Sequence, residues 1–455
     1  FALPSASEGA TAGAASPRGR LRRILAIAWP VVVNNFLNSA ALFVDVFLVA
    51  FLGATALASV GLASQVFFLA AALASGLSTG VIALTARAVG ARDKEQEGRV
   101  VLTALLLAVL MSLPLAVLGF LYATELLGLL GASPEVAEAG AVYLRILSLA
   151  APFEFFNLVA TGVLNAQGRT RVTLIVNLAI NAVHLLLDYV LIFGAFGFPS
   201  MGIAGAAVAT AVSFGVGSVV FFALLRPSLP STWSRLPYDG PMAARLFRVG
   251  APSALEDGLL NFGFMVYTLL ILGFGATALA AHQVGLRILS FAFMPGFGFS
   301  AAAAALVGQS LGAKDPEGAE QAGWYSMGLG LAIMVAMAVP LYLFSEPIAG
   351  LLSHGDPATL ELSVTWIALI TLTIPPIAIH FSGAGALRGA GDTRWTLLVS
   401  FVGLFALRIP AAYLLGFVLG LGIEGVWLAY LLEYYVRAGL TVARFHRGRW
   451  KALKI

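Results

Sequence analysis

A long internal repeat constrains this sequence more than any other feature. When the sequence is shifted by 222 residues, Pro30 aligns with Pro252, "GATALA" at 53–58 aligns with "GATALA" at 275–280, and "GARD" at 90–93 aligns with "GAKD" at 312–315. With one residue inserted, "GRTR" at 168–171 then aligns with "GDTR" at 391–394. The chain is therefore two copies of one unit of roughly 210–220 residues, and repeats of this kind in a hydrophobic chain are typical of transporters.

Composition decides whether water or lipid surrounds the fold, and here it indicates lipid. Hydrophobic residues make up 60% of the chain and charged residues only 11%, which is too little charge to cover a water-soluble surface. The apolar runs are much longer than the ~10-residue alternating strands of a membrane barrel, so they indicate helices. The chain has no cysteine, which excludes disulfides and cysteine-ligated metal sites.

The spacing of apolar runs predicts an all-α integral membrane protein with twelve transmembrane helices, six in each copy. The predicted spans are 24–51, 57–86, 100–123, 136–164, 172–196 and 202–226, followed by 245–273, 279–308, 321–345, 359–387, 395–418 and 421–446. An even number of spans in each copy makes the two repeats parallel.

The predicted domains follow from these spans. They are a mobile tail at 1–23, an N-lobe at 24–226, a connector at 227–244, a C-lobe at 245–446 and a basic tail at 447–455. Basic residues gather in alternate connections and near both termini, and the opposite connections near 51–56, 124–138 and 346–358 contain no lysine or arginine. The positive-inside rule then predicts that both termini and the connector are cytoplasmic. Topology also accounts for the basic isoelectric point, so we expect no nucleic-acid partner.

Polar residues inside the predicted spans are the candidates for function. An isolated aspartate at the centre of a membrane helix costs about 2.5–3.5 kcal/mol, so each one needs a partner or a role. Helical spacing places them in three stripes that imply a shared polar chamber in the N-lobe. The stripes are Asn34, Asn38 and Asp45 in the first span, Tyr143, Glu154, Asn157 and Thr161 in the fourth, and Asn177, Asn181, His184 and Asp188 in the fifth.

Such a chamber has two possible chemistries. Asp45 and Asp188 could exchange a proton near neutral pH, or their oxygens, with asparagine carbonyls, could bind Na⁺. The alternative is that these residues only join helices by hydrogen bonds, which suits Asn34 and Asn177. We favour ion binding for Asp45 and Asp188, and we include Asn38, Asn181, His184, Tyr143, Glu154 and Asn157 in the predicted ion-coupling site.

The second copy is chemically different from the first. In the 222-residue register Tyr267 replaces Asp45, while Glu256, Asp257 and Asn261 suggest a second cation site in the C-lobe. These acids could instead lie at a wet helix end. Arg408 lies inside a predicted span, and we expect it to pair with an acid or to cap carbonyl groups. Phenylalanine and methionine residues at 288–300, in particular Phe291, Phe293 and Met294, could line a substrate cleft for flat organic cations, or could face lipid.

Several motifs carry a family resemblance. They are "NNFLNSAALFVDVFLVAFLG" in the first span, "LNAQGRTR" after the fourth, "LLLDYVLIFG" in the fifth, "AAHQV" in the eighth and "LRGAGDTRW" after the tenth. On these motifs the chain resembles the multidrug and toxic compound extrusion family, and within it the DinF-like branch. The resemblance covers nearly the whole chain beyond the first residues.

The resemblance implies an antiporter whose two lobes enclose a central cleft and which exports organic cations in exchange for H⁺ or Na⁺ by alternating access. It implies ion coupling in the N-lobe at Asp45 and Asp188, and Tyr143 matches a tyrosine on the cleft side of that lobe. The sequence departs from the branch at His184, where asparagine is frequent. It also departs at Leu260, where branches that couple through the C-lobe have glutamate; Glu256 lies one turn earlier.

Two other classes of function are less well supported. A flippase for lipid-linked precursors would have related repeats, but its central cavity should be basic to hold pyrophosphate, whereas the N-lobe stripes are acidic. An enzyme in the membrane would need clustered nucleophiles, bases or metal ligands, and no such motif is visible. We therefore expect no enzyme activity and no cofactor other than H⁺ or Na⁺. We expect a monomer in the plasma membrane of a prokaryote, or in an organelle membrane.

Overall fold

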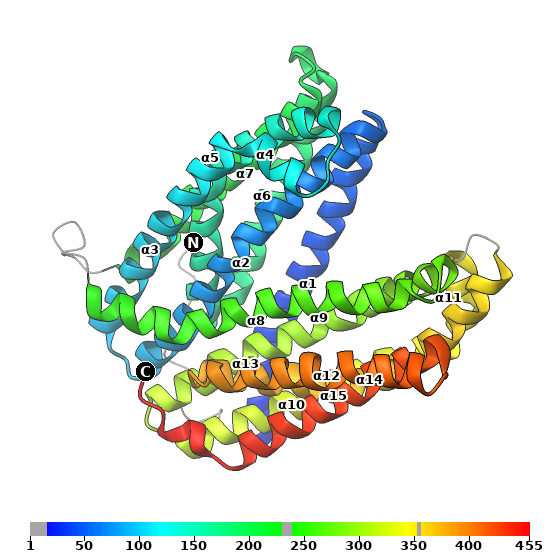
Figure 1. Ribbon diagram of the computed structural model, residues 1–455. Coiled ribbons are helices and arrows are strands. Elements are labelled where there is room, and N and C mark those ends of the chain that lie inside the picture. The colour runs from blue at the N-terminus through cyan, green and yellow to red at the C-terminus, as the bar shows by residue number, and fades with distance from the viewer. Residues whose placement is uncertain (1–15, 230–238, 353–355) are drawn as a thin grey trace. The chain divides into compact units, whose positions relative to one another are not determined.

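The structure is a computed structural model that describes residues 16–229, 239–352 and 356–455 (Figure 1). Within these ranges every regular element is a helix. This confirms the predicted all-α fold class. Part of the predicted tail (1–15) and part of the predicted connector (230–238) lie outside the described residues.

The two halves of the chain contain the same series of helices. The first half has α1 (Pro17–Ala50), α2 (Ala54–Gly90), α3 (Lys94–Leu121), α4 (Ala123–Leu129), α5 (Pro134–Ala166), α6 (Thr170–Phe193) and α7 (Gly202–Leu225). The second half has α8 (Gly240–Leu272), α9 (Ala276–Gly312), α10 (Pro316–Leu343), α11 (Ser345–Leu352), α12 (Pro357–Gly389), the broken span α13 (Thr393–Phe401) to α14 (Ile409–Tyr413), and α15 (Gly422–His446). The short helices α4 and α11 were not predicted, yet they occupy equivalent places in the repeat.

Eleven of the described helical segments are long and apolar enough to cross a membrane, and α15 is the twelfth predicted span. Helix α15 has 25 residues but lower hydropathy, because it carries Glu433 and Arg437 near its middle. Both side chains are buried and they form an ion pair with each other. The predicted twelve-helix membrane fold is therefore confirmed, and the charges that set α15 apart are neutralised inside the protein.

Helix α1 begins earlier than the sequence analysis predicted. Ser16 caps it, because its hydroxyl accepts a hydrogen bond from the backbone N–H of Gly19 at 3.1 Å. Pro17 follows as the first helical residue, a position that proline favours because its missing N–H would have no partner there. The arginines at 18–23, which the sequence analysis places in the tail, are therefore helical.

The chain folds into two compact units whose boundaries lie inside α1 and α8. The N-terminal unit contains Val33–Ala254, and the C-terminal unit contains Leu255–Ile455 together with the segment that ends at Val32. Each boundary follows a proline of the repeat by two residues, Pro30 in α1 and Pro252 in α8. Each unit thus completes its core with half of a helix that begins in the other copy of the repeat.

Two contacts show how these helix halves are held. In the C-terminal unit Arg23 of α1 donates to the side-chain oxygen of Gln309 on α9 at 2.8 Å, and Ile24, Ile27 and Ala28 pack against Phe299, Ala302 and Leu306. In the N-terminal unit the first half of α8 packs closely on α2. A Cβ atom on Gly80 would lie only 2.6 Å from the carbonyl oxygen of Leu246.

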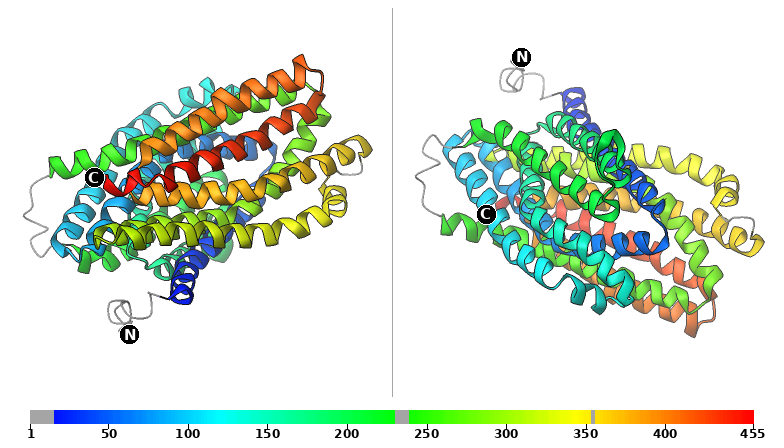
Figure 2. Two further views of the ribbon diagram at one scale, coloured as in Figure 1. Left: turned by 90° about the horizontal axis from the view of Figure 1, so that it is seen from below. Right: turned by 90° about the horizontal axis from the view of Figure 1, so that it is seen from above.

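In the C-terminal unit α10, α12 and α15 run side by side, and α9 also packs on α12 (Figures 1 and 2). Small residues permit the closest of these approaches, as is usual between membrane helices. A Cβ atom on Gly385 would lie 2.3 Å from the carbonyl oxygen of Ser300, and one on Gly389 would lie 2.2 Å from that of Ala304. Both oxygens belong to α9.

The span that contains α13 and α14 is not a regular α-helix. Residues 402–408 (η4, Val402–Arg408) and 414–418 (η5, Leu414–Val418) form π-helical turns. A π-turn places one extra residue in a helix and is often found at functional sites. The equivalent helix of the N-terminal unit, α6, is α-helical throughout.

We expect Gly389→Ala to destabilise the protein, because α9 and α12 would have to move apart to accept the methyl group. Overpacking of this kind costs about 1–3 kcal/mol, so the melting temperature in detergent should fall. The matched control is Gly439→Ala on α15, where a Cβ atom meets no described atom within 4 Å. Equal melting temperatures for the two variants would contradict the close packing of α9 and α12.

Candidate functional site

Three titratable side chains meet inside the N-terminal unit. Asp45 of α1 and His184 and Asp188 of α6 each offer one ligand atom, and these atoms all lie within 4.8 Å of one another. His184 and Asp188 are four residues apart, so they lie on one face of α6. We call this group the acidic site. It brings together the three residues that the sequence analysis placed at the centre of ion coupling.

The carboxylates of the acidic site are buried and poorly satisfied. Asp188 is 0% exposed and Asp45 is 8% exposed. Neither oxygen of Asp188, nor Oδ1 of Asp45, accepts a hydrogen bond from any described residue. The Nε2 atom of His184 lies 3.2 Å from Oδ2 of Asp188. A buried polar group left in this state is costly, so the site favours a ligand that fills it.

Thr210 of α7 fixes the orientation of His184. The hydroxyl of Thr210 donates to the backbone oxygen of Ala206 at 3.0 Å, and the same oxygen lies 3.0 Å from Nε2 of His184. When Nε2 carries a proton, it can donate to the hydroxyl oxygen of Thr210, whose own proton is directed to Ala206. Tyr143 of α5 is buried and its hydroxyl hydrogen-bonds Thr210 and Ser64. Thr210 was not predicted, because a lone threonine in an apolar span gives no signal.

Of the other predicted N-lobe residues, two join α1 to α6 and two lie apart. The side-chain amide of Asn181 donates to the amide oxygen of Asn38 at 2.8 Å. Asn157 donates to the backbone oxygen of Phe214 at 3.0 Å and accepts from Ser218 at 2.9 Å, so it connects α5 to α7. Glu154 is not part of the described group of close ligands formed by Asp45, His184 and Asp188.

The C-terminal unit uses Glu256 differently from the predicted cation site. Its carboxylate is 1% exposed and accepts hydrogen bonds from Arg388 at 2.9 Å, Thr396 at 2.9 Å and Ser400 at 2.6 Å. An arginine therefore already supplies the positive charge that a bound cation would bring. Asn261 donates to the backbone oxygen of Asp257 at 2.9 Å. Glu256 is bound to Arg388, Thr396 and Ser400, so it is not available to a cation. A cation site at Asp257 and Asn261 stays a prediction.

A second buried ion pair in this unit confirms the expectation for Arg408. Its guanidinium forms an ion pair with Glu433 of α15, and both side chains are 0% exposed. Arg437 binds the other oxygen of Glu433 at 3.1 Å and donates to Ser400 at 2.6 Å. Ser400 also donates to Glu256, so the two ion pairs form one connected network. The partners of Arg408 could not be named from the sequence, because pairing between spans leaves no local pattern.

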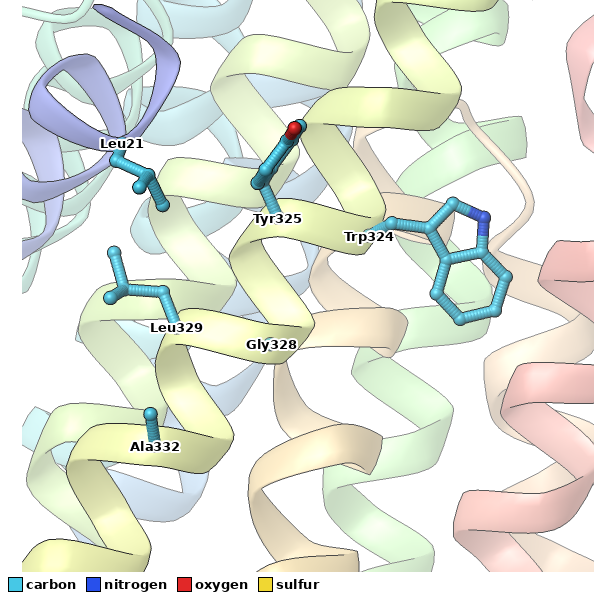
Figure 3. Close-up of a pocket in the computed structure, with 6 residues that line it drawn as sticks. All are labelled: Leu21, Trp324, Tyr325, Gly328, Leu329 and Ala332. Carbon is cyan, nitrogen blue, oxygen red and sulfur yellow. The ribbon is translucent and has the colours of Figure 1, made fainter. Parts of the chain in front are cut away.

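The aromatic residues predicted to line a substrate cleft do not form one group. Phe291 is exposed, Met294 is buried, and Phe293 stacks on Phe381 with ring centroids 5.5 Å apart. A separate apolar groove lies between α1 and α10 (Figure 3). It is lined by Leu21, Trp324, Tyr325, Gly328, Leu329 and Ala332. The groove has no charged lining residue, so it offers nothing to couple to an ion.

Comparison with known proteins agrees with this architecture. The MatE family model matches residues 30–190 and 252–414. A protein of Thermotoga maritima named "Probable multidrug resistance protein NorM" is 29% identical over 442 residues, which cover 94% of this chain and 93% of the relative. In Burkholderia vietnamiensis, "Multidrug resistance protein NorM" is 32% identical over 451 residues, which cover 96% of this chain and 97% of the relative.

Solved structures show the same fold. A crystal structure of a MATE protein in the bent conformation matches with a TM-score of 0.87 at 23% identity and covers 94% of this chain and 95% of its own. The outward-facing structure of a multidrug resistance MATE family transporter matches with a TM-score of 0.86 at the same identity and coverage. At this level of identity the likeness concerns the fold.

Two six-helix repeats that span a membrane and bury unsatisfied polar groups define the class of this protein, which is a membrane transporter and not an enzyme. The chain belongs to the MatE family of multidrug and toxic compound extrusion transporters. The predicted family is confirmed, and assignment to the DinF-like branch stays a prediction.

We expect Glu256→Gln to lower the melting temperature, because the partly exposed Arg388 would lose its counter-ion and the buried hydroxyls of Thr396 and Ser400 would lose a charged acceptor. Removing one partner of a buried ion pair costs up to about 3–5 kcal/mol. The control is Glu361→Gln, because Glu361 is exposed on α12, and its melting temperature should be that of the parent. A Glu256→Gln variant as stable as the parent would contradict the structural role assigned to this pair.

Proposed function

We propose that the protein is a secondary active antiporter that exports organic compounds, often cationic and aromatic, in exchange for H⁺ or Na⁺ by alternating access. Ion coupling takes place at Asp45 and Asp188 in the N-terminal unit. The observation that carries this proposal is the pair of buried carboxylates with unsatisfied oxygens.

The geometry of the acidic site suits a small cation. Two carboxylates this close repel each other when both are ionised in a buried environment. A proton shared between them, or a Na⁺ bound by them, relieves the repulsion. The attraction between the ion and the carboxylates is strong only while water is excluded from the site. A conformational change that admits water therefore weakens binding and releases the ion. Release on one side of the membrane and binding on the other is what an antiporter requires.

The direction of transport and the class of substrate are supported by the relatives. Those of Thermotoga maritima and Burkholderia vietnamiensis are both named as multidrug resistance proteins. Resistance implies export, so we propose export of small organic molecules from the cytoplasm. The acidic character of the site is less suited to a flippase for pyrophosphate-linked lipids, which would need a basic cavity.

We propose that the protein works as a monomer in the plasma membrane of a prokaryote, with both termini in the cytoplasm. The orientation is supported by the basic connections and by the arginines at the start of α1. Loading proteoliposomes with a fluorescent organic cation and imposing pH and Na⁺ gradients separately tests the antiport directly.

We expect Asp45→Asn and Asp188→Asn to fold and to reach the membrane but to lose gradient-driven transport. Asparagine retains the size of aspartate but neither titrates nor attracts Na⁺ as a carboxylate does. Transport should fall to the rate measured without a gradient. Glu125→Gln is the matched control, because Glu125 is exposed on α4, and it should transport at the parental rate.

The assignment fails if either aspartate variant transports as fast as the parent under the same gradient. A melting temperature close to that of the parent is needed for each variant, so that a loss of transport cannot be attributed to unfolding.

We expect His184→Asn to transport but with a changed pH profile or with a new response to Na⁺. The protonated imidazole is attracted by Asp188 and disfavoured by burial, so it would titrate together with the carboxylate. A positive imidazole also repels Na⁺, which favours H⁺ as the coupling ion in the parent. Rates measured between pH 5 and pH 9, about the range in which histidine and its partner change charge, check this expectation. An unchanged profile, with Na⁺-driven transport in the parent at constant pH, would contradict it.

A further inference from the structure

The guanidinium of Arg408 lies inside a cage of aromatic rings in the C-terminal unit. Its central carbon is 4.1 Å from the ring centroid of Tyr430 and between 5.2 and 5.5 Å from those of Phe264, Tyr267 and Tyr434. The Nε atom donates to Oε2 of Glu433 at 2.8 Å. Tyr267 is itself held in place, because its hydroxyl donates to the backbone oxygen of Val426 at 2.8 Å.

The cage has the chemistry of a receptor for an organic cation. Aromatic faces attract guanidinium and ammonium groups, most strongly when water is excluded, and a carboxylate supplies the opposite charge. The Nη1 atom of Arg408 is buried and has no hydrogen-bond partner among the described residues, so the ring faces around it provide its attraction. A guanidinium placed in a cage with one carboxylate is bound as a ligand would be.

The cage lies where the repeat places the counterpart of the acidic site, and backbone contacts fix the register. The backbone oxygen of Leu191 accepts from the N–H of Met201 at 2.8 Å, and that of Leu415 accepts from Leu421 at 3.1 Å. A Cβ atom on Gly205 would lie 2.6 Å from the backbone of Leu191, and one on Gly425 would lie 2.7 Å from that of Leu415. Leu191 therefore corresponds to Leu415, and Met201 to Leu421.

This register pairs each part of the acidic site with a part of the cage. His184 lies seven residues before Leu191, and Arg408 lies seven residues before Leu415. Thr210 lies nine residues after Met201, and Tyr430 lies nine residues after Leu421. The remaining pairs are Asp45 with Tyr267 from the 222-residue shift, and Asp188 with Ala412. The C-terminal copy has thus lost both aspartates, has an arginine in place of the histidine, and takes its carboxylate from Glu433.

The π-helical turn explains how Arg408 reaches this position. Thr170 and Thr393 begin the equivalent helices and are 223 residues apart, whereas Leu191 and Leu415 are 224 apart. The additional residue lies in a span that contains η4, and one extra residue is what a π-turn accommodates. The insertion brings Arg408 into the register of His184, where Leu407 would otherwise stand.

We propose that the C-terminal unit retains the counterpart of the acidic site as a cation site that is permanently occupied by the chain's own Arg408. The guanidinium is the bound cation, and Glu433 with the four aromatic rings is its receptor. Because Arg408 is fully buried and bound, neither a coupling ion nor a cationic substrate can occupy this place. Ion exchange is thereby excluded from this place in the C-terminal unit and left to the acidic site of the repeat pair, a consequence that rests on the function proposed above.

Chemical rescue tests the proposal in the full-length protein in detergent. Arg408→Ala empties the cage and should lower the melting temperature. Guanidinium at millimolar concentration, far below the molar range in which it denatures proteins, should restore part of the loss in a saturable manner. Urea has nearly the same shape but no charge, so it should not, and neither guanidinium nor urea should stabilise the parent.

Two controls identify the receptor. In Arg408→Ala/Glu433→Gln the carboxylate is absent, so guanidinium should have no stabilising effect. NaCl at the same concentration separates binding of guanidinium from an effect of ionic strength. The proposal is overturned if urea or NaCl stabilises Arg408→Ala as well as guanidinium does, or if guanidinium has no effect.

A second comparison applies if Arg408→Ala does not fold. Arg408→Lys keeps a cation that can reach the rings, whereas Arg408→Met has similar length and no charge. The lysine variant should have the higher melting temperature of the two. If the methionine variant is equally or more stable, the cage does not select a cation and the proposal is wrong.

The two proposals fail in different ways. Gradient-driven transport that persists in Asp45→Asn/Asp188→Asn would overturn ion coupling at the acidic site, whatever guanidinium does to Arg408→Ala. Absence of guanidinium rescue would overturn the occupied cage and leave coupling at the acidic site intact.

Discussion

The cost of placing charge in a low-dielectric interior governs how this protein is built. Each buried carboxylate or guanidinium must find a partner, or it weakens the fold. In the C-terminal unit the buried carboxylates meet this requirement, because Glu256 and Glu433 are each bound by arginine. In the N-terminal unit it is not met, because three oxygens of Asp45 and Asp188 have no described hydrogen-bond donor. The contrast separates a unit whose buried glutamates are paired with arginine from a unit whose buried aspartates lack such a partner.

The sequence predicted the parts of the fold that depend on local pattern. The repeat, the twelve spans and the grouping of Asp45, His184 and Asp188 follow from spacing along the chain, since residues four apart share a helix face and the repeat identifies equivalent spans. The C-terminal network could not be predicted in this way. Glu256 meets Arg388 across 132 residues, and no periodicity within either helix indicates which arginine a glutamate will reach.

Helix α15 illustrates the same limit for hydropathy. A charged residue lowers the hydropathy of a span whether or not that residue forms an ion pair in the folded protein. Glu433 forms ion pairs with both Arg437 and Arg408 inside the protein, so its charge is not exposed to lipid as the sequence alone would suggest. The early start of α1 has a related cause, because a segment without hydrophobic periodicity predicts a tail although Ser16 and Pro17 supply a helix start.

The exchange of helix halves between the units has a consequence for biogenesis. The beginning of α1 is synthesised first, yet it packs against Phe299, Ala302 and Leu306, which emerge from the ribosome more than half a chain later. The first half of α8, in turn, completes a unit whose other helices are already in the membrane. Neither repeat is therefore a self-sufficient folding unit, and the first half of α1 cannot reach its packing partners until α9 has been synthesised.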